Sequence, residues 1–194
     1  MCPADEDAPL ARDFQSGNSA AFDKLVVRHK DNIFNLCYWY LGDYQEANDA
    51  AQEAFIKIFR SLNRFRFKSA VSTWFYRITV NTCISRLKSL QYRQRKRMVP
   101  LENSGTAESD DHSVQLRDEY RNPAKELEKK ECLTLIKKAI ASLPPDQKMV
   151  VTLRDIQGLS YDEISSATGL KLGTVKSKLA RARLYLREQL REVL

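Results

Sequence analysis

Residues 159–187 read LSYDEISSATGLKLGTVKSKLARARLYLR, and this stretch predicts a helix-turn-helix with a basic second helix. Ser160 followed by Glu163 forms a capping box, in which each side chain satisfies a backbone amide at the start of a helix. Gly169 suits the tight turn after that helix, because glycine tolerates positive φ. The second helix is expected to begin within residues 172–174.

The second helix of this pair separates an apolar stripe from a cationic face. Apolar residues recur every three or four positions, at Val175, Leu179, Ala182, Leu186 and Leu190. The residues that then face away are Ser177, Ala180, Arg181 and Leu184, with Lys176 and Arg187 beside them and Lys178 and Arg183 on the flanks. A cationic outer face suits docking in the major groove of DNA, although a solvated basic helix on an ordinary bundle has the same pattern.

The composition favours a polyanionic partner. The 194 residues carry 32 Lys and Arg against 25 Asp and Glu, a formal charge of +7. A chain of this length has room for one or two domains. No apolar run approaches membrane-spanning length, and the acidic start MCPADEDAPL lacks the basic and apolar regions of a signal peptide. We therefore expect a cytoplasmic protein.

The cysteines argue against a disulfide framework or a metal centre. Cys2, Cys37, Cys83 and Cys132 lie far apart, without a CxxC motif and with only two histidines in the chain. Reduced thiols fit this spacing, and Cys37 and Cys83 lie within apolar patterns as small core residues. No paired carboxylates or metal-spaced ligands accompany the basic surfaces. We therefore expect no metal, no cofactor and no catalytic residue.

The first half of the chain begins with two predicted helices. One is capped by Asn18 or Ser19 and ends at Gly42, and the next is capped by Asp43. Their inward residues are Phe22, Leu25, Val26, Ile33, Leu36, Cys37 and Tyr40 in the first helix, and Ala47, Ala50, Ala51, Ala54, Phe55, Ile58 and Leu62 in the second.

A third helix completes this half. It follows a basic, aromatic loop at residues 63–70 and runs from about Val71 to beyond Leu87. Its inward residues are Trp74, Phe75 and Ile78. No convincing period-two strand occurs anywhere in the chain, so the fold class is predicted to be all-α.

The two halves are predicted to be separate domains joined by a flexible acidic linker. Residues 98–122 are rich in Asp, Glu, Ser and Asn and bury too little apolar surface to offset the entropy of ordering. Pro123 then opens a helix that ends at Pro144, and a short helix around residues 147–154 precedes the helix-turn-helix. The predicted organisation is a tail at 1–9, a helical domain at 10–97, the linker at 98–122 and a small domain at 123–194.

Several motifs in this order resemble those of bacterial extracytoplasmic-function (group IV) sigma factors, which keep only sigma regions 2 and 4. The motifs are DAAQEAFI at residues 49–56, STWFYRITVNT at 72–82, LPPD at 143–146, GLSYDEI at 158–164 and GTVKSK at 173–178. The resemblance covers about residues 10–97 as region 2 and 123–192 as region 4. It implies a transcription initiation factor that binds core RNA polymerase, at the β′ clamp and the β flap, and lends it promoter specificity. It implies neither an enzyme nor a small-molecule substrate.

The resemblance also implies a polymerase-binding segment on the second predicted helix. Its residues Asp49, Gln52, Glu53 and Phe55 match the part of region 2 that docks on the β′ clamp. Mixed apolar and polar surfaces suit such contacts, because apolar burial anchors them and polar pairs set the register. The alternative is a capped helix with solvated acids, in which Phe55 belongs to the internal core.

The loop at residues 63–69 and the helix after it match the element that reads and melts the minus-ten promoter element. The implied residues are Arg64, Phe65, Arg66, Phe67 and Lys68 in the loop, and Arg77 and Asn81 on the helix. Aromatic rings can receive unstacked bases while cations hold the displaced phosphates. Family sequences usually have a small or acidic residue near Phe67, so the identity of the captured base stays open.

The basic run from Arg86 to Arg97 is interpreted as contacting the DNA backbone.

In region 4 the resemblance places four residues of the basic helix in the major groove of the minus-thirty-five element, in agreement with the periodicity. They are Lys176, Ser177, Ala180 and Arg181. Arginine or lysine can pair with guanine, and a methyl group can meet a thymine methyl. Phosphate contacts are implied for Tyr161, Thr174, Lys178 and Arg183.

Two further points follow from the sequence. A stand-alone dimeric helix-turn-helix regulator explains residues 159–187 equally well, but it leaves the aromatic loop and residues 49–55 without a purpose.

Members of the resembled family are commonly held inactive by an anti-sigma factor, often membrane-bound. The chain is therefore expected in the cytoplasm, with an anti-sigma factor that can hold it at the inner membrane.

Overall fold

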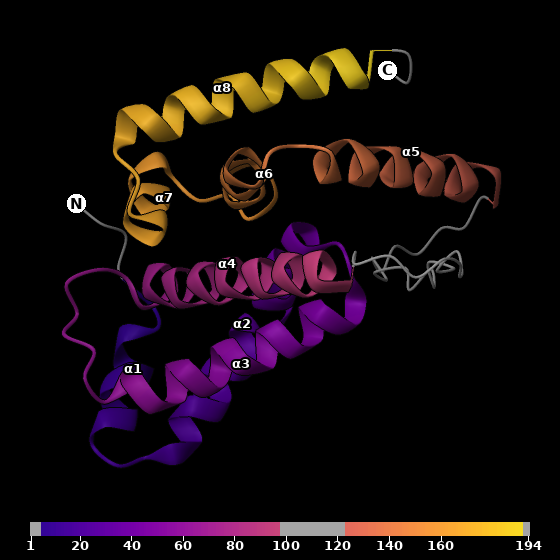
Figure 1. The fold of residues 1–194 in the computed structure, drawn as a ribbon. Helices are drawn as coiled ribbons and strands as arrows, with labels where there is room; N and C mark the ends of the chain where they lie inside the picture. The colour runs from indigo at the N-terminus through magenta and orange to yellow at the C-terminus, as the bar shows by residue number, and fades with distance from the viewer. Residues whose placement is uncertain (1–4, 98–122, 192–194) are drawn as a thin grey trace.

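The computed structural model describes residues 5–97 and 123–191 and places helices in two groups (Figure 1). The first group is α1 (Ala8–Gln15), α2 (Ser19–Leu41), α3 (Tyr44–Leu62) and α4 (Val71–Arg97). The second is α5 (Pro123–Ala141), α6 (Pro145–Val151), the π-helix η1 (Thr152–Ile156), α7 (Tyr161–Thr168) and α8 (Leu172–Gln189). The described ranges contain no strand, which confirms the all-α prediction. The predicted linker at 98–122 lies outside the described residues.

The predicted caps set the ends of the helices in the first group. The side chain of Asn18 accepts a hydrogen bond from the amide of Ala20 at 3.2 Å, and Gly42 ends α2 in the left-handed region. The Asp43 carboxylate accepts the amide of Glu46 at 2.7 Å and so begins α3. The sequence boundaries of α2 and α3 are therefore confirmed.

The core of this group is continuous across its helices. Its largest fully buried side chains include Leu25, Ile33, Leu36, Ile58, Leu62, Val71, Phe75 and Val80. Cys37 and Cys83 are also fully buried, with their sulfur atoms 3.5 Å apart. The hydrogen bond to Cys37 and burial together raise the pKa of the Cys83 thiol. The Cys83 thiol is thus protonated, and both cysteines are buried core residues, as predicted.

Helix α1 was not predicted, and its stability comes from packing. It has only 8 residues, too few for a hydrophobic period to be recognised. Ala11 and Phe14 are buried, and the Phe14 ring lies 5.6 Å from that of Phe22 and 5.4 Å from that of Phe59. The helix begins at Ala8, so it overlaps the predicted tail at 1–9.

A buried carboxylate fastens the start of α1 to α2. Asp7 accepts one hydrogen bond from Arg28 at 2.5 Å, and its other oxygen lies 2.7 Å from Nε2 of His29. Burial acts to raise the pKa of Asp7, but the hydrogen bond and charge of His29, followed by those of Arg28, outweigh it and lower the pKa. Asp7 therefore stays ionised at neutral pH.

Asp7→Asn is expected to destabilise the protein in a pH-dependent way. A carboxylate with a lowered pKa contributes stability above its unfolded value, ordinarily 3.8, and this is lost as pH falls through the folded value. The variant should therefore lose about 1–3 kcal/mol at pH 7, and its difference from the native chain should shrink below about pH 4. Urea unfolding at several pH values measures this. If the difference in free energy of unfolding between the two proteins did not change with pH, the charge of Asp7 would not be the cause of the destabilisation.

The second group contains the predicted helix-turn-helix. The Ser160 amide donates to the Glu163 carboxylate at 2.8 Å, and the Glu163 amide donates to the Ser160 hydroxyl at 3.3 Å, which confirms the capping box. Gly169 ends α7 with φ of +74°. The short helix predicted around 147–154 is α6 followed by η1, in which the Gln157 amide donates to the Thr152 carbonyl at 3.0 Å.

The two groups pack on one another. Helix α7 lies on α4, and α6 and η1 contact α2 (Figure 1). The Tyr76 hydroxyl donates to the Gln157 side chain at 3.2 Å, and the Lys148 ammonium donates to the Tyr40 carbonyl at 3.4 Å. Burial and the charge of Glu163 raise the pKa of Tyr76 to about 12. The phenol is thus a neutral donor at the centre of this contact.

Candidate nucleic-acid interface

The outer face of α8 has the orientation that the sequence predicted. Val175, Leu179 and Ala182 are buried against the second group. The predicted groove-facing residues Lys176, Ser177, Ala180 and Arg181 are all exposed. Helix α8 lies at the outer edge of the molecule in Figure 1. A DNA major groove is about 12 Å wide and admits an α-helix.

Two of the predicted phosphate-binding cations have carboxylate partners. The Lys178 ammonium lies 2.8 Å from the Asp146 carboxylate, and Arg183 pairs with Asp155. The hydrogen bonds that Arg183 donates to the Asp155 carboxylate outweigh desolvation and raise the pKa of Arg183. Both pairs lie at the surface, where such interactions contribute little stability. A phosphate can therefore displace these carboxylates at low cost.

Tyr161 joins the two helices of the helix-turn-helix. Its ring lies 5.0 Å from the Arg154 guanidinium and 5.9 Å from the Lys176 ammonium. The Arg154 side chain also donates to the Leu159 carbonyl at 2.7 Å. The half-buried Tyr161 thus contacts one of the cations that are predicted to face the groove, a contact that the sequence did not reveal.

The aromatic loop presents its cations and one of its two rings. Arg64, Arg66 and Lys68 are exposed. Phe65 is only 8% exposed, and its ring packs 4.8 Å from that of Trp74. Phe67 is half-buried, with its ring 4.9 Å from that of Phe65. Phe65 therefore supports Phe67 from inside the domain, and Phe67 is the ring nearer to solvent.

Helix α4 continues this surface beyond the loop. Arg77 and Asn81 are both exposed and lie about one helical turn apart, as the sequence predicted. Phe75 is buried and Trp74 half-buried against the core, in agreement with the predicted inward set. Tyr76 is covered by the second group of helices.

The predicted polymerase-binding residues lie along α3 in different settings. Gln52 is exposed, and Phe55 is half-buried against the core. Asp49 and Glu53 have side chains that are 42% and 45% exposed, so both are accessible to a partner. Ile56 and Phe59, each about half exposed, extend this face with apolar surface. Their position off the inward stripe of α3 was the available sequence signal.

Arg86 organises the acidic side of this face. It pairs with Glu46, lies 2.8 Å from the Asp49 carboxylate and lies 3.8 Å from that of Glu53. Desolvation acts to lower the pKa of Arg86, but Glu46 and Asp49 outweigh it and raise the pKa. The sequence assigned this cation to DNA, whereas the structure uses it to join α4 to α3.

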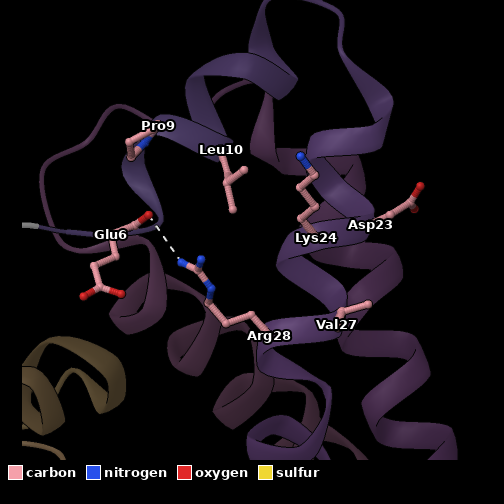
Figure 2. Close-up of a pocket in the computed structure, with 7 residues that line it drawn as sticks. All are labelled: Glu6, Pro9, Leu10, Asp23, Lys24, Val27 and Arg28. Atoms are coloured by element: carbon pink, nitrogen blue, oxygen red, sulfur yellow. Dashed lines mark hydrogen bonds between the residues drawn. The ribbon is translucent and has the colours of Figure 1, made fainter.

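A groove of about 650 Å³ between α1 and α2 lies apart from these surfaces (Figure 2). It is lined by Glu6, Pro9, Leu10, Asp23, Lys24, Val27 and Arg28. Arg28 reaches across it and donates to the Glu6 carbonyl at 3.3 Å. Both signs of charge line the groove, so it has no single-sign character for a charged ligand.

Two family models match this chain in the order that the motifs predicted. Sigma-70 region 2 matches residues 25–93, and Sigma-70, region 4 matches residues 133–186. The RNA polymerase sigma-H factor of Pseudomonas aeruginosa is 34% identical over 194 residues, covering 100% of this chain and 98% of that protein. The ECF RNA polymerase sigma-E factor of Escherichia coli strain K12 is 36% identical over 177 residues, covering 91% of this chain and 90% of that protein.

Solved structures share the fold at lower identity. The structure of CnrH in complex with the cytosolic domain of CnrY matches with a TM-score of 0.67 and 22% identity, covering 96% of this chain and 97% of that chain. The sigma factor RpoE in complex with the anti-sigma factor NepR from Bartonella quintana matches with a TM-score of 0.65 and 22% identity, covering 88% and 96%. In the part of this chain that the structure describes, no helix is long and apolar enough to cross a membrane. Together, the two matched regions and the relatives that span the whole chain show that it belongs to the extracytoplasmic-function RNA polymerase sigma factors, which are transcription initiation factors and not enzymes.

Proposed function

We propose that this sigma factor binds core RNA polymerase through α3 and reads the minus-thirty-five element with α8. The minus-ten element is read and opened by α4 with the loop before it. The observation that carries the proposal is the outer face of α8, where Lys176, Ser177, Ala180 and Arg181 are exposed opposite the buried Val175, Leu179 and Ala182. The cations on this face can contact base edges and phosphates, and the small side chains of Ser177 and Ala180 allow the helix to approach the groove closely.

The polymerase contact is assigned to Asp49, Gln52 and Glu53, with Ile56 and Phe59 as apolar anchors. These side chains lie on one exposed stretch of α3 and combine carboxylates, an amide and apolar surface. Phe55 is assigned a supporting role, because it packs toward the core. The contact with the β flap of the polymerase is assigned to the second group of helices.

The minus-ten contact is assigned to Phe67, Arg77 and Asn81, with the loop cations on phosphates. Phe67 offers a ring near solvent, and Asn81 offers an amide to a base edge. Arg64, Arg66 and Lys68 are exposed on the same loop, and their charges can hold phosphates. Phe65 acts beneath Phe67 as a platform.

The chain is also proposed to be cytoplasmic and restrained by an anti-sigma factor that can hold it at the inner membrane. One protein of this fold, the RpoE of Bartonella quintana, was solved with the anti-sigma factor NepR. The acidic and apolar face of α3 is the surface that such a partner must cover to compete with polymerase.

Run-off transcription with purified core polymerase and a promoter library tests the main proposal. Adding this chain should give promoter-dependent transcripts that share a minus-ten and a minus-thirty-five sequence. A stand-alone dimeric regulator supplies no transcripts in this assay, so an inactive mixture with intact core polymerase would overturn the proposal.

Arg181→Ala and Lys178→Ala are expected to have different effects on the minus-thirty-five contact. Arg181→Ala should cost about 1–3 kcal/mol and relax preference at one base position, because a base-edge contact is lost. Lys178→Ala should weaken binding uniformly over sequences and reduce the salt slope by about one. Holoenzyme binding to a minus-thirty-five library at several salt concentrations measures both. Identical sequence profiles for the two variants would contradict the orientation assigned to α8.

A further inference from the structure

Residues 5–15, which precede α2, contact the aromatic loop at its beginning. The side-chain amide of Gln15, at the end of α1, donates to the Leu62 carbonyl at 2.8 Å and to the Phe65 carbonyl at 2.9 Å. Both acceptors are backbone groups at the point where α3 gives way to the loop. One side chain thus fixes the path of the chain into the loop, from about fifty positions away in sequence.

The same segment also holds the middle and the end of the loop. The Arg12 guanidinium lies 5.1 Å from the centre of the Phe67 ring. The Asp5 carboxylate accepts a hydrogen bond from the Val71 amide at 2.8 Å, where the loop becomes α4. Residues 5–15 therefore contact the loop at its entry, at Phe67 and at its exit.

Phe67 gives these contacts a specific consequence. Its φ of +52° is the only positive φ of a non-glycine residue in the described parts of the chain. Such a conformation carries strain, and it persists only where the surroundings hold the backbone in place. Residues 5–15 supply side-chain hydrogen bonds at both ends of this loop, beside the packing of Phe65 on Trp74.

The segment has its own anchor on α2, so it can act as a rigid brace. Asp7 pairs with Arg28 and His29, and Arg28 also donates to the Glu6 carbonyl (Figure 2). Phe14 packs against Phe22 and Phe59, whose rings also contact one another. The brace is thereby attached to two helices that do not belong to the loop.

We propose that residues 5–15 position the loop at 63–70 for promoter opening, with Gln15 as the main positioning residue and Arg12 supporting Phe67. The inference rests on the proposed role of this loop at the minus-ten element. A flexible loop would have to be ordered when a base stacks on Phe67, and that entropy would weaken capture of the base. A loop already held at three points avoids this cost and keeps the ring in one orientation.

The test compares holoenzymes that carry Gln15→Met or Arg12→Ala. Methionine keeps the length of the side chain and removes both donors. Permanganate reactivity of unpaired thymines should fall about tenfold for Gln15→Met, as expected from the loss of two hydrogen bonds. Preference at one or two minus-ten positions should also relax. Arg12→Ala should show a smaller effect of the same kind. Minus-thirty-five preference and affinity for core polymerase should not change.

Asp13→Ala is the matched control, because Asp13 lies on the exposed side of α1. It should open promoters as the native chain does. Normal opening with an unchanged minus-ten profile in both variants would overturn the positioning role. An equal loss of opening, core affinity and minus-thirty-five preference would overturn it too, since that pattern indicates general destabilisation.

The experiment distinguishes failure of the positioning role from failure of the proposed function. If Gln15→Met fails to fold, as judged by circular dichroism, Arg12→Ala decides the matter, because Arg12 is exposed and its removal leaves the core intact. If the native holoenzyme itself opens no promoter, the proposed function fails and the positioning role fails with it. If the native holoenzyme opens promoters and the variants do so equally well, only the positioning role fails.

Discussion

Phe75→Ala is expected to lower the free energy of unfolding of the first group of helices by about 3–5 kcal/mol. The Phe75 side chain is 1% exposed and is the largest of the fully buried side chains in the described residues. Its ring meets the edge of His29, with centroids 5.1 Å apart, and lies against Trp74. Alanine removes these contacts and leaves a cavity between α2 and α4. Urea unfolding followed by circular dichroism measures the loss.

Ile56→Ala provides the control for this substitution. Ile56 is 50% exposed on α3, so its truncation should cost less than about 1 kcal/mol. Similar costs for the two variants would mean that the core does not depend on Phe75. Because the chain has two groups of helices, the unfolding curve should be followed with a second probe, such as Trp fluorescence, to detect an intermediate.

Arg86→Met is expected to affect both stability and polymerase binding. The variant removes the cation shared by Glu46, Asp49 and Glu53 and leaves three carboxylates close together at the contact of α3 with α4. The expected cost is about 1–3 kcal/mol, moderated because the carboxylates are partly solvated. Affinity for core polymerase should fall about tenfold, because Asp49 loses the group that orients it, while Glu53 keeps its ion pair with Lys57 at 2.7 Å. Fluorescence anisotropy with purified core polymerase gives the affinity.

Lys88→Met separates this role from DNA binding. Lys88 lies on the same helix, is exposed and belongs to the basic run that the sequence assigned to the DNA backbone. It should leave unfolding and core affinity unchanged and lower only the salt slope of promoter binding. If Arg86→Met behaved as Lys88→Met does, the original assignment of Arg86 to DNA would be restored.

Local chemistry explains why most helices could be predicted from the sequence. The caps at Asn18, Asp43 and Ser160 are short-range hydrogen bonds, and Gly42 and Gly169 end helices through their own backbone freedom. The apolar spacing on α8 predicted its orientation for the same reason, because a helical period needs only neighbours in sequence. Helix α1 was missed because its formation depends on Phe14 packing against distant rings.

Pairing between distant charges could not be predicted from the sequence. Arg86, Lys178 and Arg183 were read as free cations for DNA, but each has a carboxylate partner between 28 and 40 positions away. The aromatic loop was read as two equivalent rings, yet its path places Phe65 inside the domain and Phe67 nearer to solvent. Such assignments depend on tertiary packing, which a sequence pattern does not contain.

The packing of α7 on α4 links the two halves of the molecule thermodynamically. Some ligands can bind only after the two halves separate. The apparent affinity of such a ligand is its intrinsic affinity multiplied by the fraction of molecules that are already separated, so it falls about a hundredfold if that fraction is one in a hundred. Linkage is reciprocal, so occupation of α4 and occupation of α8 must favour one another by the same factor whenever both require separation. The hydrogen bond between Tyr76 and Gln157 is one of the contacts that contribute to this coupling free energy.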